Sequence, residues 1–168
     1  MSKLKNMRII SIPKFTAVSS GAHPLNELFG AGGFSEWCNA HPLLLRDSLY
    51  ECMDFLWHEN NSIDTSVYIW AVRDGVTAAD VAPYALIEFP GGLFLVATAD
   101  EKDNDDLNET VDCMYQWIEN SDVFEYGDFP QSGMCNMPGP EADRLLGIAQ
   151  QQIFLPLKPV IKNQETIL

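Results

Sequence analysis

The spacing of apolar residues along the chain predicts two helices and a larger number of strands. Apolar positions recur with helical spacing over 43–60 and again over 105–120, with charged residues on the opposite side of each helix. Short apolar segments rich in β-branched and aromatic residues, bounded by Gly, Pro or polar clusters, predict strands. These strands are expected over 7–19 (interrupted at Pro13), 66–72, 84–89, 93–99, 131–137 and 153–157. The remaining expectations are a Gly-rich loop over 20–42, a connection over 74–82, a loop over 122–130 and a short helix over 141–148.

The order of these elements predicts an α+β fold. Strand, helix, strand and strand occur once and then occur again, which favours a mostly antiparallel sheet with two main helices on one face and a cleft between them. We expect residues 1–168 to form a single domain with pseudo-repeats at about 7–90 and 91–160. The repetition is in the order of elements, because the residues themselves show no repeat.

Charge narrows the classes of partner. The chain has 24 acidic and 10 basic residues, for a net charge of −14. Most of the excess lies in 100–128, where Lys102 is the single base. This balance argues against binding to nucleic-acid phosphates or anionic membranes. The segment that starts at Asp100 does not match a calcium-binding EF-hand, since the sixth and twelfth positions hold Asp105 and Val111. We expect a solvated acidic helix.

The spacing of the cysteines indicates whether they bind a metal and whether the protein is in a reducing compartment. Four cysteines are present at Cys38, Cys52, Cys113 and Cys135, without the close pairs that zinc sites usually show. We therefore expect reduced thiols, no metal and no cofactor. No segment resembles a signal peptide or is long enough to span a membrane. A cytoplasmic location is the expectation that follows.

Three segments carry a resemblance to a known family. They are Glu-Phe-Pro-Gly-Gly-Leu-Phe at 88–94, Tyr-Gln-Trp-Ile-Glu-Asn-Ser at 115–121 and Ile-Phe-Leu-Pro-Leu-Lys at 153–158. In order and spacing they resemble the GyrI-like family, the effector-binding domain of AraC-type and multidrug-sensing regulators. The resemblance implies a duplicated module that binds apolar, often cationic, small molecules. Because about six residues precede the first strand, we expect a free-standing protein without a helix-turn-helix, which senses or sequesters its ligand.

The chain departs from the family pattern at one position of interest. The family often places a Glu beside a Tyr in the strand after the second helix, inside the pocket. Residues 130–136 hold neither an acid nor an aromatic residue, so an acid that anchors a cation must come from elsewhere. Glu88, on a strand with apolar neighbours, and Glu36, beside Trp37 in the Gly-rich loop, are the candidates. Each can equally be a carboxylate that faces water.

The aromatic residues leave two interpretations open, a ligand-binding wall or ordinary core. Tyr68 and Trp70 share a face of their strand by period-two alternation, while Trp117 is expected in the core. Small-molecule pockets are mostly apolar with few polar anchors. The full set of predicted ligand-binding residues is Glu36, Trp37, Tyr68, Trp70, Glu88, Phe94 and Tyr115.

Two other functions remain open. No catalytic serine motif is present, but Glu36 and Glu88 together could activate water, as the family's hydrolases of cyclopropane-bearing compounds would require. The acidic surface could instead serve a protein-binding module of the gyrase-inhibitor kind. A second copy of the chain and a separate regulatory protein are both open as partners.

Overall fold

The computed structural model describes residues 5–46, 53–59, 64–127, 133–136 and 149–160, with the single positions 145 and 147. Within these ranges the strands form one antiparallel sheet in the order β1-β6-β9-β8-β3-β4-β2-β5, with β7 paired to β9. The strands are β1 (Lys5–Ile12), β2 (Phe15–His23), β3 (Asp54–His58), β4 (Ser66–Ala71), β5 (Ala85–Phe89), β6 (Gly92–Asp100), β7 (Phe124–Tyr126), β8 (Met134–Asn136) and β9 (Gln150–Pro159). The expected α+β fold with a mostly antiparallel sheet is confirmed.

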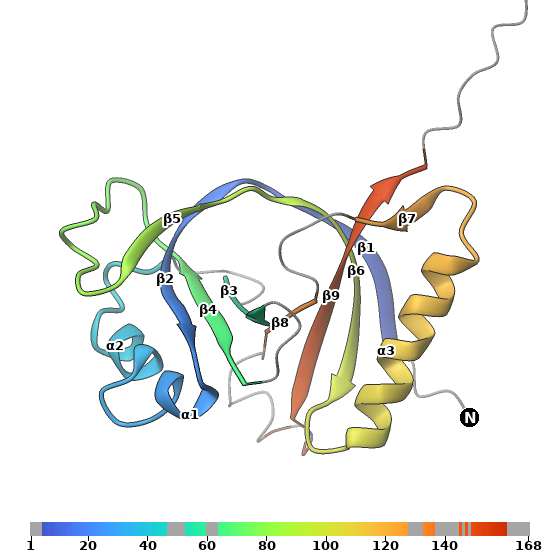
Figure 1. The fold of residues 1–168 in the computed structure, drawn as a ribbon, viewed down its shortest axis with the longest axis horizontal. Helices are drawn as coiled ribbons and strands as arrows, with labels where there is room; N and C mark the ends of the chain where they lie inside the picture. Colours follow the sequence, from blue (N-terminus) through green and yellow to red (C-terminus); the bar gives the residue numbers. More distant parts are fainter. Residues whose placement is uncertain are drawn as a thin grey trace, which may run out of the picture.

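The segment that contains β1 and β2 and the segment that contains β5 and β6 bend together and give the sheet its arched shape. β1 and β2 are separated only by Pro13 and Lys14, and β5 and β6 only by Pro90 and Gly91. The pairing continues across both bends, because Ile12 faces Gly92 and Phe15 faces Phe89. The ribbon therefore curls over the top of the molecule and carries one arm of the sheet on each side (Figure 1).

Among the described residues, three helices cover the outer face of the sheet, the face turned away from the inside of the arch (Figure 1). The short helices α1 (Leu25–Leu28) and α2 (Phe34–Ala40) lie against one arm, and α3 (Asn104–Glu119) lies against the other. Leu28, Phe34 and Cys38 from the first pair are buried against β2 and β4. Met114 and Ile118 of α3 are buried against β6 and β9. The helices bury the outer apolar positions of both arms.

A second core fills the inner face of the sheet, which lies inside the arch. It contains more aromatic rings than the outer clusters, and these rings stack or meet edge to face. The buried members are Ile12, Phe15, Ala17, Phe55, Trp57, Val67, Ile69, Ala71, Phe89, Phe94, Val96, Met134 and Phe154. Both faces of the sheet are thus apolar, which explains why the strands read as nearly continuous apolar runs.

The first predicted helix is wrong wherever it falls on described residues. Asp54–His58, inside the predicted 43–60 helix, is strand β3, and Leu45 makes an isolated bridge to Val72. The predicted 20–42 loop instead contains the end of β2 and both short helices, and the predicted 122–130 loop contains β7. Residues 47–52, and most of the predicted helix at 141–148, lie outside the described residues.

The second predicted helix is confirmed, and so are its boundaries to within one residue. α3 begins after Asp103, whose carboxylate accepts hydrogen bonds from the backbone N–H groups of Asp105 and Asp106 at 3.1 Å each. The strands predicted over 66–72, 84–89, 93–99 and 153–157 are also present. Among the described residues, none of the helices has the length and apolar character needed to cross a bilayer.

Removal of the α3 cap gives a first prediction. Asp103→Ala should lower the free energy of unfolding by about 1 kcal/mol, because two backbone N–H groups lose their side-chain acceptor. Asp112→Ala, at an exposed position in the middle of the same helix, is the control and should change stability much less. Urea unfolding of both variants provides the measurement, and equal losses would contradict the capping role.

Candidate functional site on the inner face of the sheet

The inner face of the sheet combines an aromatic floor with a small number of polar side chains. Phe154 meets Phe55 edge to face at 5.3 Å and Phe94 at 6.5 Å. Phe55 also stacks on Phe89 at 5.8 Å, and Phe89 stacks on Phe15 at 4.7 Å. These rings are fixed by one another beneath the bend of the arch.

Strand register places polar side chains on this same face. Gln152 faces Thr98 on β6 and Asn136 on β8, and each of the three is two residues from a buried inner-face residue on its strand. Residues directly opposite one another in an antiparallel pair share a face. Thr98 and Asn136 are buried, and Ser19, opposite Ile69, is buried on the same face. Polar groups on this face are therefore withdrawn from water.

Gln152 carries an acceptor that the described residues leave unsatisfied. Its Oε1 is buried and has no hydrogen-bond partner among the described parts of the chain. A buried acceptor without a donor costs roughly 1–3 kcal/mol, and such groups in native proteins usually meet a water or a ligand. The inner face thus holds a hydrogen-bond acceptor that the described residues do not satisfy.

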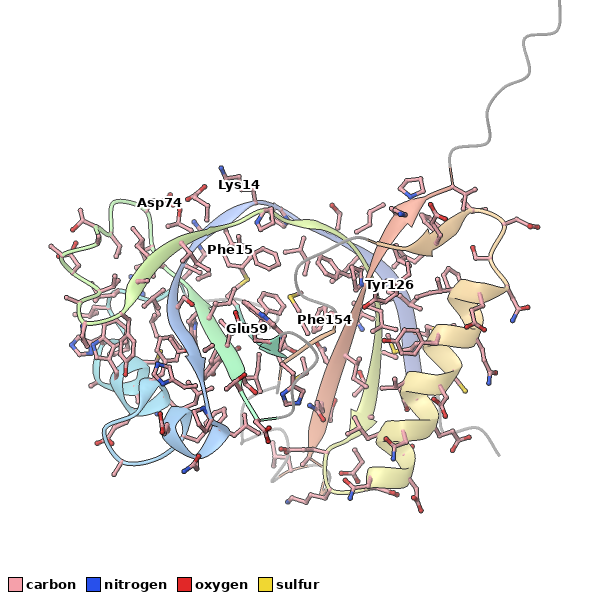
Figure 2. The ribbon with its side chains drawn as sticks, viewed as in Figure 1. Lys14, Phe15, Glu59, Asp74, Tyr126 and Phe154 are labelled. Carbon is pink, nitrogen blue, oxygen red and sulfur yellow. The ribbon has the colours of Figure 1, made fainter. Side chains whose placement is uncertain are left out.

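Glu59 supplies a carboxylate at the end of β3. Phe55 and Trp57 point to the inner face, and the N–H of Glu59 extends the pairing with β4 by bonding to the carbonyl oxygen of Thr65 at 3.1 Å. Alternation along the strand places the Glu59 side chain on the same face as Trp57. Figure 2 shows Glu59 and Phe154 between the two arms of the arch. Glu59 is half-buried, and Trp57 precedes it by two residues on the same face.

Sequence reasoning missed Glu59 because it fell at the end of the predicted 43–60 helix. The period-two series Phe55, Trp57 and Glu59 is the signal that identifies it once the segment is seen as a strand. The acid that sequence reasoning sought outside 130–136 thus has a third candidate, one residue beyond the strand that pairs directly with β8.

Three of the predicted ligand-binding residues lie together on the outer face, under α1 and α2. Tyr68 is buried, and Trp37 and Trp70 are partly buried against the same cluster. Trp37 meets Tyr84 at 5.3 Å, and Tyr68 lies 6.4 Å from Trp70. The indole nitrogen of Trp70 is buried without a hydrogen-bond partner among the described residues. These rings form one packed aromatic cluster on the side of the sheet opposite Glu59.

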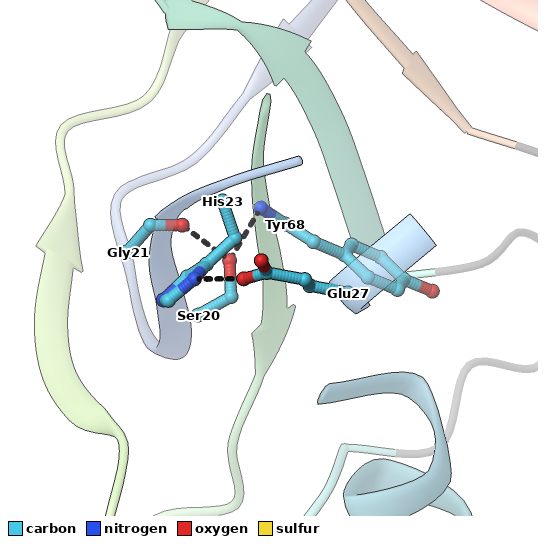
Figure 3. A network of polar contacts seen from close by, with 5 residues as sticks. All are labelled: Ser20, Gly21, His23, Glu27 and Tyr68. Atoms are coloured by element: carbon cyan, nitrogen blue, oxygen red, sulfur yellow. Dashed lines mark hydrogen bonds and ion pairs between the residues drawn. The ribbon is translucent and has the colours of Figure 1, made fainter. Parts of the chain in front are cut away.

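A β-bulge and its hydrogen bonds fix Tyr68 in that cluster. The β2–β4 register shifts between Ser19 and Ala22, and the Ser20 hydroxyl accepts the Tyr68 N–H at 2.9 Å in place of a ladder partner. Figure 3 shows this bond beside the His23–Glu27 ion pair, 3.2 Å long, that joins the end of β2 to α1. The Tyr68 hydroxyl donates to Asp54 Oδ2 at 2.9 Å.

The buried thiols near Asp54 are not activated nucleophiles. Burial, together with the nearby Asp54 charge, raises the pKa of the Cys38 thiol to about 12. Burial raises the pKa of Cys135 to about 11, although a hydrogen bond with Gln151 acts in the opposite direction. The reactive form of cysteine is the thiolate, so both groups are protonated and unreactive near neutral pH. Within the described residues no cluster of His, Cys, Asp and Glu is arranged to hold a metal ion.

The other predicted residues are spread over the molecule. Phe94 is fully buried in the inner core, and Tyr115 is exposed on α3, where it stacks on Tyr126 at 5.8 Å. Glu36 is exposed on α2 and accepts the N–H of Gly32 at 2.6 Å. The structure therefore does not gather the seven residues at one place. Trp117, expected in the core, is partly buried against the outer cluster of α3.

Glu88 faces solvent and has a basic partner. Lys14 Nζ lies 2.7 Å from Glu88 Oε2, and the Thr16 hydroxyl donates to Oε1 at 2.7 Å. Bonding to Lys14 and then to Thr16 lowers the pKa of the Glu88 carboxyl. We interpreted Glu88 as a carboxylate in apolar surroundings that needs a ligand cation. This geometry does not support that interpretation, because Lys14 and Thr16 already bond to it.

This geometry predicts how Glu88 titrates. Lys14→Met should raise the pKa of Glu88 toward its ordinary value, because the larger of the two stabilising bonds is lost. Carboxyl ¹³C NMR during a pH titration measures the change. Lys102→Met, a change of equal charge away from Glu88, is the control. An unchanged Glu88 titration in Lys14→Met would contradict the pairing.

The fold is shared with proteins of known structure. Over 94% of this chain and 99% of the other, it resembles the C-terminal domain of EcmrR, with a TM-score of 0.67 and 16% identity. It also resembles SAV2435 bound to tetraphenylphosphonium, with a TM-score of 0.53, 14% identity, and coverage of 92% and 94% of the two chains. At identities this low the likeness establishes the fold. No protein-family model matches the chain, and no curated protein matches it.

A third similar structure is EcmrR in a DNA complex. The TM-score is 0.66 at 14% identity, and the match covers 95% of this chain but 59% of the EcmrR chain. The similar structures thus include a C-terminal domain, a protein with tetraphenylphosphonium bound and a chain in a complex with DNA. The absence of nucleic-acid binding by this chain stays a prediction.

Proposed function

We propose that this chain binds a hydrophobic, cationic small molecule on the inner face of its sheet and acts by sensing or sequestering it. The observation that carries the proposal is the half-buried carboxylate of Glu59 on the same face as the buried aromatic rings, where Gln152 presents an unsatisfied acceptor. A carboxylate compensates a ligand's charge, and aromatic rings receive both its apolar surface and its positive charge.

The physical case for a cation rests on desolvation. A charge interacts more strongly as its surroundings become less polar, and the Glu59 side chain is half-buried. Apolar rings alone would accept neutral and charged ligands alike, so the carboxylate is what creates a preference. The similarity to SAV2435, determined with tetraphenylphosphonium bound, supports the same class of ligand.

The predicted ligand-binding residues that lie on the outer face provide an alternative site for the same function. Trp37, Tyr68 and Trp70 form a cluster there, and Glu36 lies on the same helix as Trp37. We favour the inner face because the Glu36 carboxylate is exposed and bonded to Gly32, while Tyr68 is held by Ser20 and Asp54. Those groups already have local partners.

Tetraphenylphosphonium is the probe for the first test. It should stabilise the protein against thermal unfolding, and its affinity should fall about tenfold in Glu59→Gln, equal to roughly 1.4 kcal/mol. Triphenylphosphine oxide, which has similar rings and no charge, should bind both proteins with nearly equal affinity. Glu109→Gln, at an exposed position on α3, controls for the change in net charge.

Two results would reject the proposal. One is the absence of any stabilisation by tetraphenylphosphonium at concentrations where lipophilic cations remain soluble. The other is an equal loss of affinity for the charged and the neutral probe in Glu59→Gln, which would show that the substitution disturbs packing rather than charge.

A further inference from the structure

A separate pocket of about 400 Å³ lies on the outer face of the sheet, near the bend of the arch. Thr16 and Glu88 form one wall, since they face each other across β2 and β5 on the side opposite Phe15 and Phe89. The other wall comes from Arg46 and from the turn after β4. Figure 2 shows Lys14 and Asp74 on the outside of the arch, above Phe15.

The charge of this pocket is opposite to that of the chain. Three bases line it, namely Lys14, Arg46 and Arg73, against the two acids Asp74 and Glu88. The pocket therefore carries 3 − 2 = +1 by its side chains, in a chain of net charge −14. Three of the ten basic residues of the sequence meet at this one place.

Backbone hydrogen bonds fix the two segments that carry Arg46 and Arg73. The Leu45–Val72 bridge joins their segments, with Arg46 N–H bonded to the Ala71 carbonyl oxygen at 2.8 Å and Arg73 N–H to the Leu44 carbonyl oxygen at 2.9 Å. Arg73 Nε also donates to the Leu45 carbonyl oxygen at 2.7 Å. The Arg73 guanidinium, held in this way, loses little freedom when it binds an oxyanion, and the backbone of Arg46 is fixed beside it.

Each acid in the pocket already pairs with one of its bases, Asp74 with Arg46 and Glu88 with Lys14. Arg46 pairs with Asp74 at 2.8 Å, but the Asp74 side chain is 97% exposed. An exposed ion pair contributes little to stability, so an incoming oxyanion can take the place of Asp74 at small cost. Val72 is buried, and Val76 beside it is half-buried, which gives the pocket an apolar part next to its charged rim.

We propose that this pocket binds the phosphate or carboxylate group of a small ligand, with Arg46, Arg73 and Lys14 around the oxyanion and the ligand's apolar part against Val72 and Val76. The volume falls within the range of small-molecule sites. Arginine is suited to planar, two-point contacts with both oxyanions. This site lies across the sheet from Glu59 and has the opposite charge preference.

The test uses phenyl phosphate, benzoate and inorganic phosphate, each titrated into the full chain by isothermal calorimetry. Phenyl phosphate should bind more tightly than inorganic phosphate, because only the former reaches the apolar part of the pocket. Binding of phenyl phosphate in preference to benzoate identifies a phosphate ligand, and the reverse identifies a carboxylate ligand. Either result supports the proposal, and the absence of binding by all three probes at millimolar concentration overturns it.

Matched variants separate this site from general electrostatics. Arg46→Gln should weaken binding of the preferred probe at least tenfold, whereas Lys102→Gln, an equal change in charge outside the pocket, should leave it within twofold. Asp74→Asn should strengthen binding, because it removes the competing carboxylate while leaving the backbone intact. Equal losses in Arg46→Gln and Lys102→Gln, or weaker binding in Asp74→Asn, would overturn the proposal. Tetraphenylphosphonium binding should be the same in all three variants.

Discussion

Gly91→Ala is expected to lower the free energy of unfolding by about 3 kcal/mol or more. Gly91 lies at the bend of the arch with φ of +74°, a conformation that residues with a Cβ rarely adopt. A Cβ at this position would lie 2.5 Å from the Ile12 carbonyl oxygen and 2.7 Å from the Lys14 nitrogen, both of which are backbone atoms. The chain can relieve these overlaps only by moving β1–β2 away from β5–β6.

Gly75→Ala is the matched control for Gly91→Ala. Gly75 has φ of +87°, but a Cβ there would meet nothing within 4 Å. It should therefore show only the backbone penalty, about 1–2 kcal/mol. Urea unfolding of both variants, compared at equal m-values, separates the steric effect from the conformational one. Equal losses in the two variants would contradict the close crossing at the bend.

Phe154→Ala should be as damaging or more so, with a loss of about 3–5 kcal/mol. Phe154 is almost fully buried at the centre of the inner face, where it contacts Phe55 and Phe94. Its truncation removes apolar burial and leaves a cavity that the rigid β6–β9–β8 backbone cannot close. If the variant still folds, we expect weakened binding of tetraphenylphosphonium and triphenylphosphine oxide alike, because the floor is shared by both ligands.

Phe29→Ala provides the comparison for Phe154→Ala. Phe29 is 46% exposed on the outer face, beside Tyr68. Its truncation should destabilise the protein by less than about 1 kcal/mol, since much of the ring is already in water. Chemical unfolding of both variants measures the difference. Similar losses in the two variants would show that the inner face is not the main core.

The helices and strands that were predicted correctly can be recognised from the pattern of their own residues. α3 is amphipathic over sixteen residues and carries its own cap at Asp103, so periodicity alone locates it. β4 and β6 are rich in β-branched and aromatic residues and are bounded by turn signals. The α+β class follows from the order of these elements.

The parts that were missed depend on contacts that sequence does not display. β3 is covered on both faces, by Leu45 and Tyr68 on one side and by Phe89 on the other. It has only three successive apolar residues, Phe55 to Trp57, and Leu56 continues a helical spacing of apolar residues that begins at Leu45. α1 and α2 have four and seven residues, which is too short for periodicity to show. The misassignment of β3 is what concealed Glu59.

The candidate site also has features that were predicted from sequence and features that depend on contacts. Trp37, Tyr68 and Trp70 were predicted as ligand-binding residues, and they lie in one cluster, while their role in binding stays a prediction. Which side of the sheet each ring occupies depends on register, and a shift of one residue exchanges the two faces. The partner of Glu88 depends on the pairing of β2 with β5, which brings Thr16 and Lys14 to it from 72 and 74 residues away in sequence.

The four tryptophans provide the most direct test of the central claim, that a hydrophobic cation binds on the inner face. Trp57 belongs to the inner core, Trp37 and Trp70 to the outer cluster under α1 and α2, and Trp117 to the cluster under α3. Their indole N–H resonances in a ¹H–¹⁵N spectrum therefore report on separate surfaces during a titration with tetraphenylphosphonium. We predict a saturable shift of the Trp57 resonance that is lost in Glu59→Gln, with the other three nearly unchanged. Saturable shifts of Trp37 and Trp70 with Trp57 unmoved would contradict the account and place the ligand on the outer face.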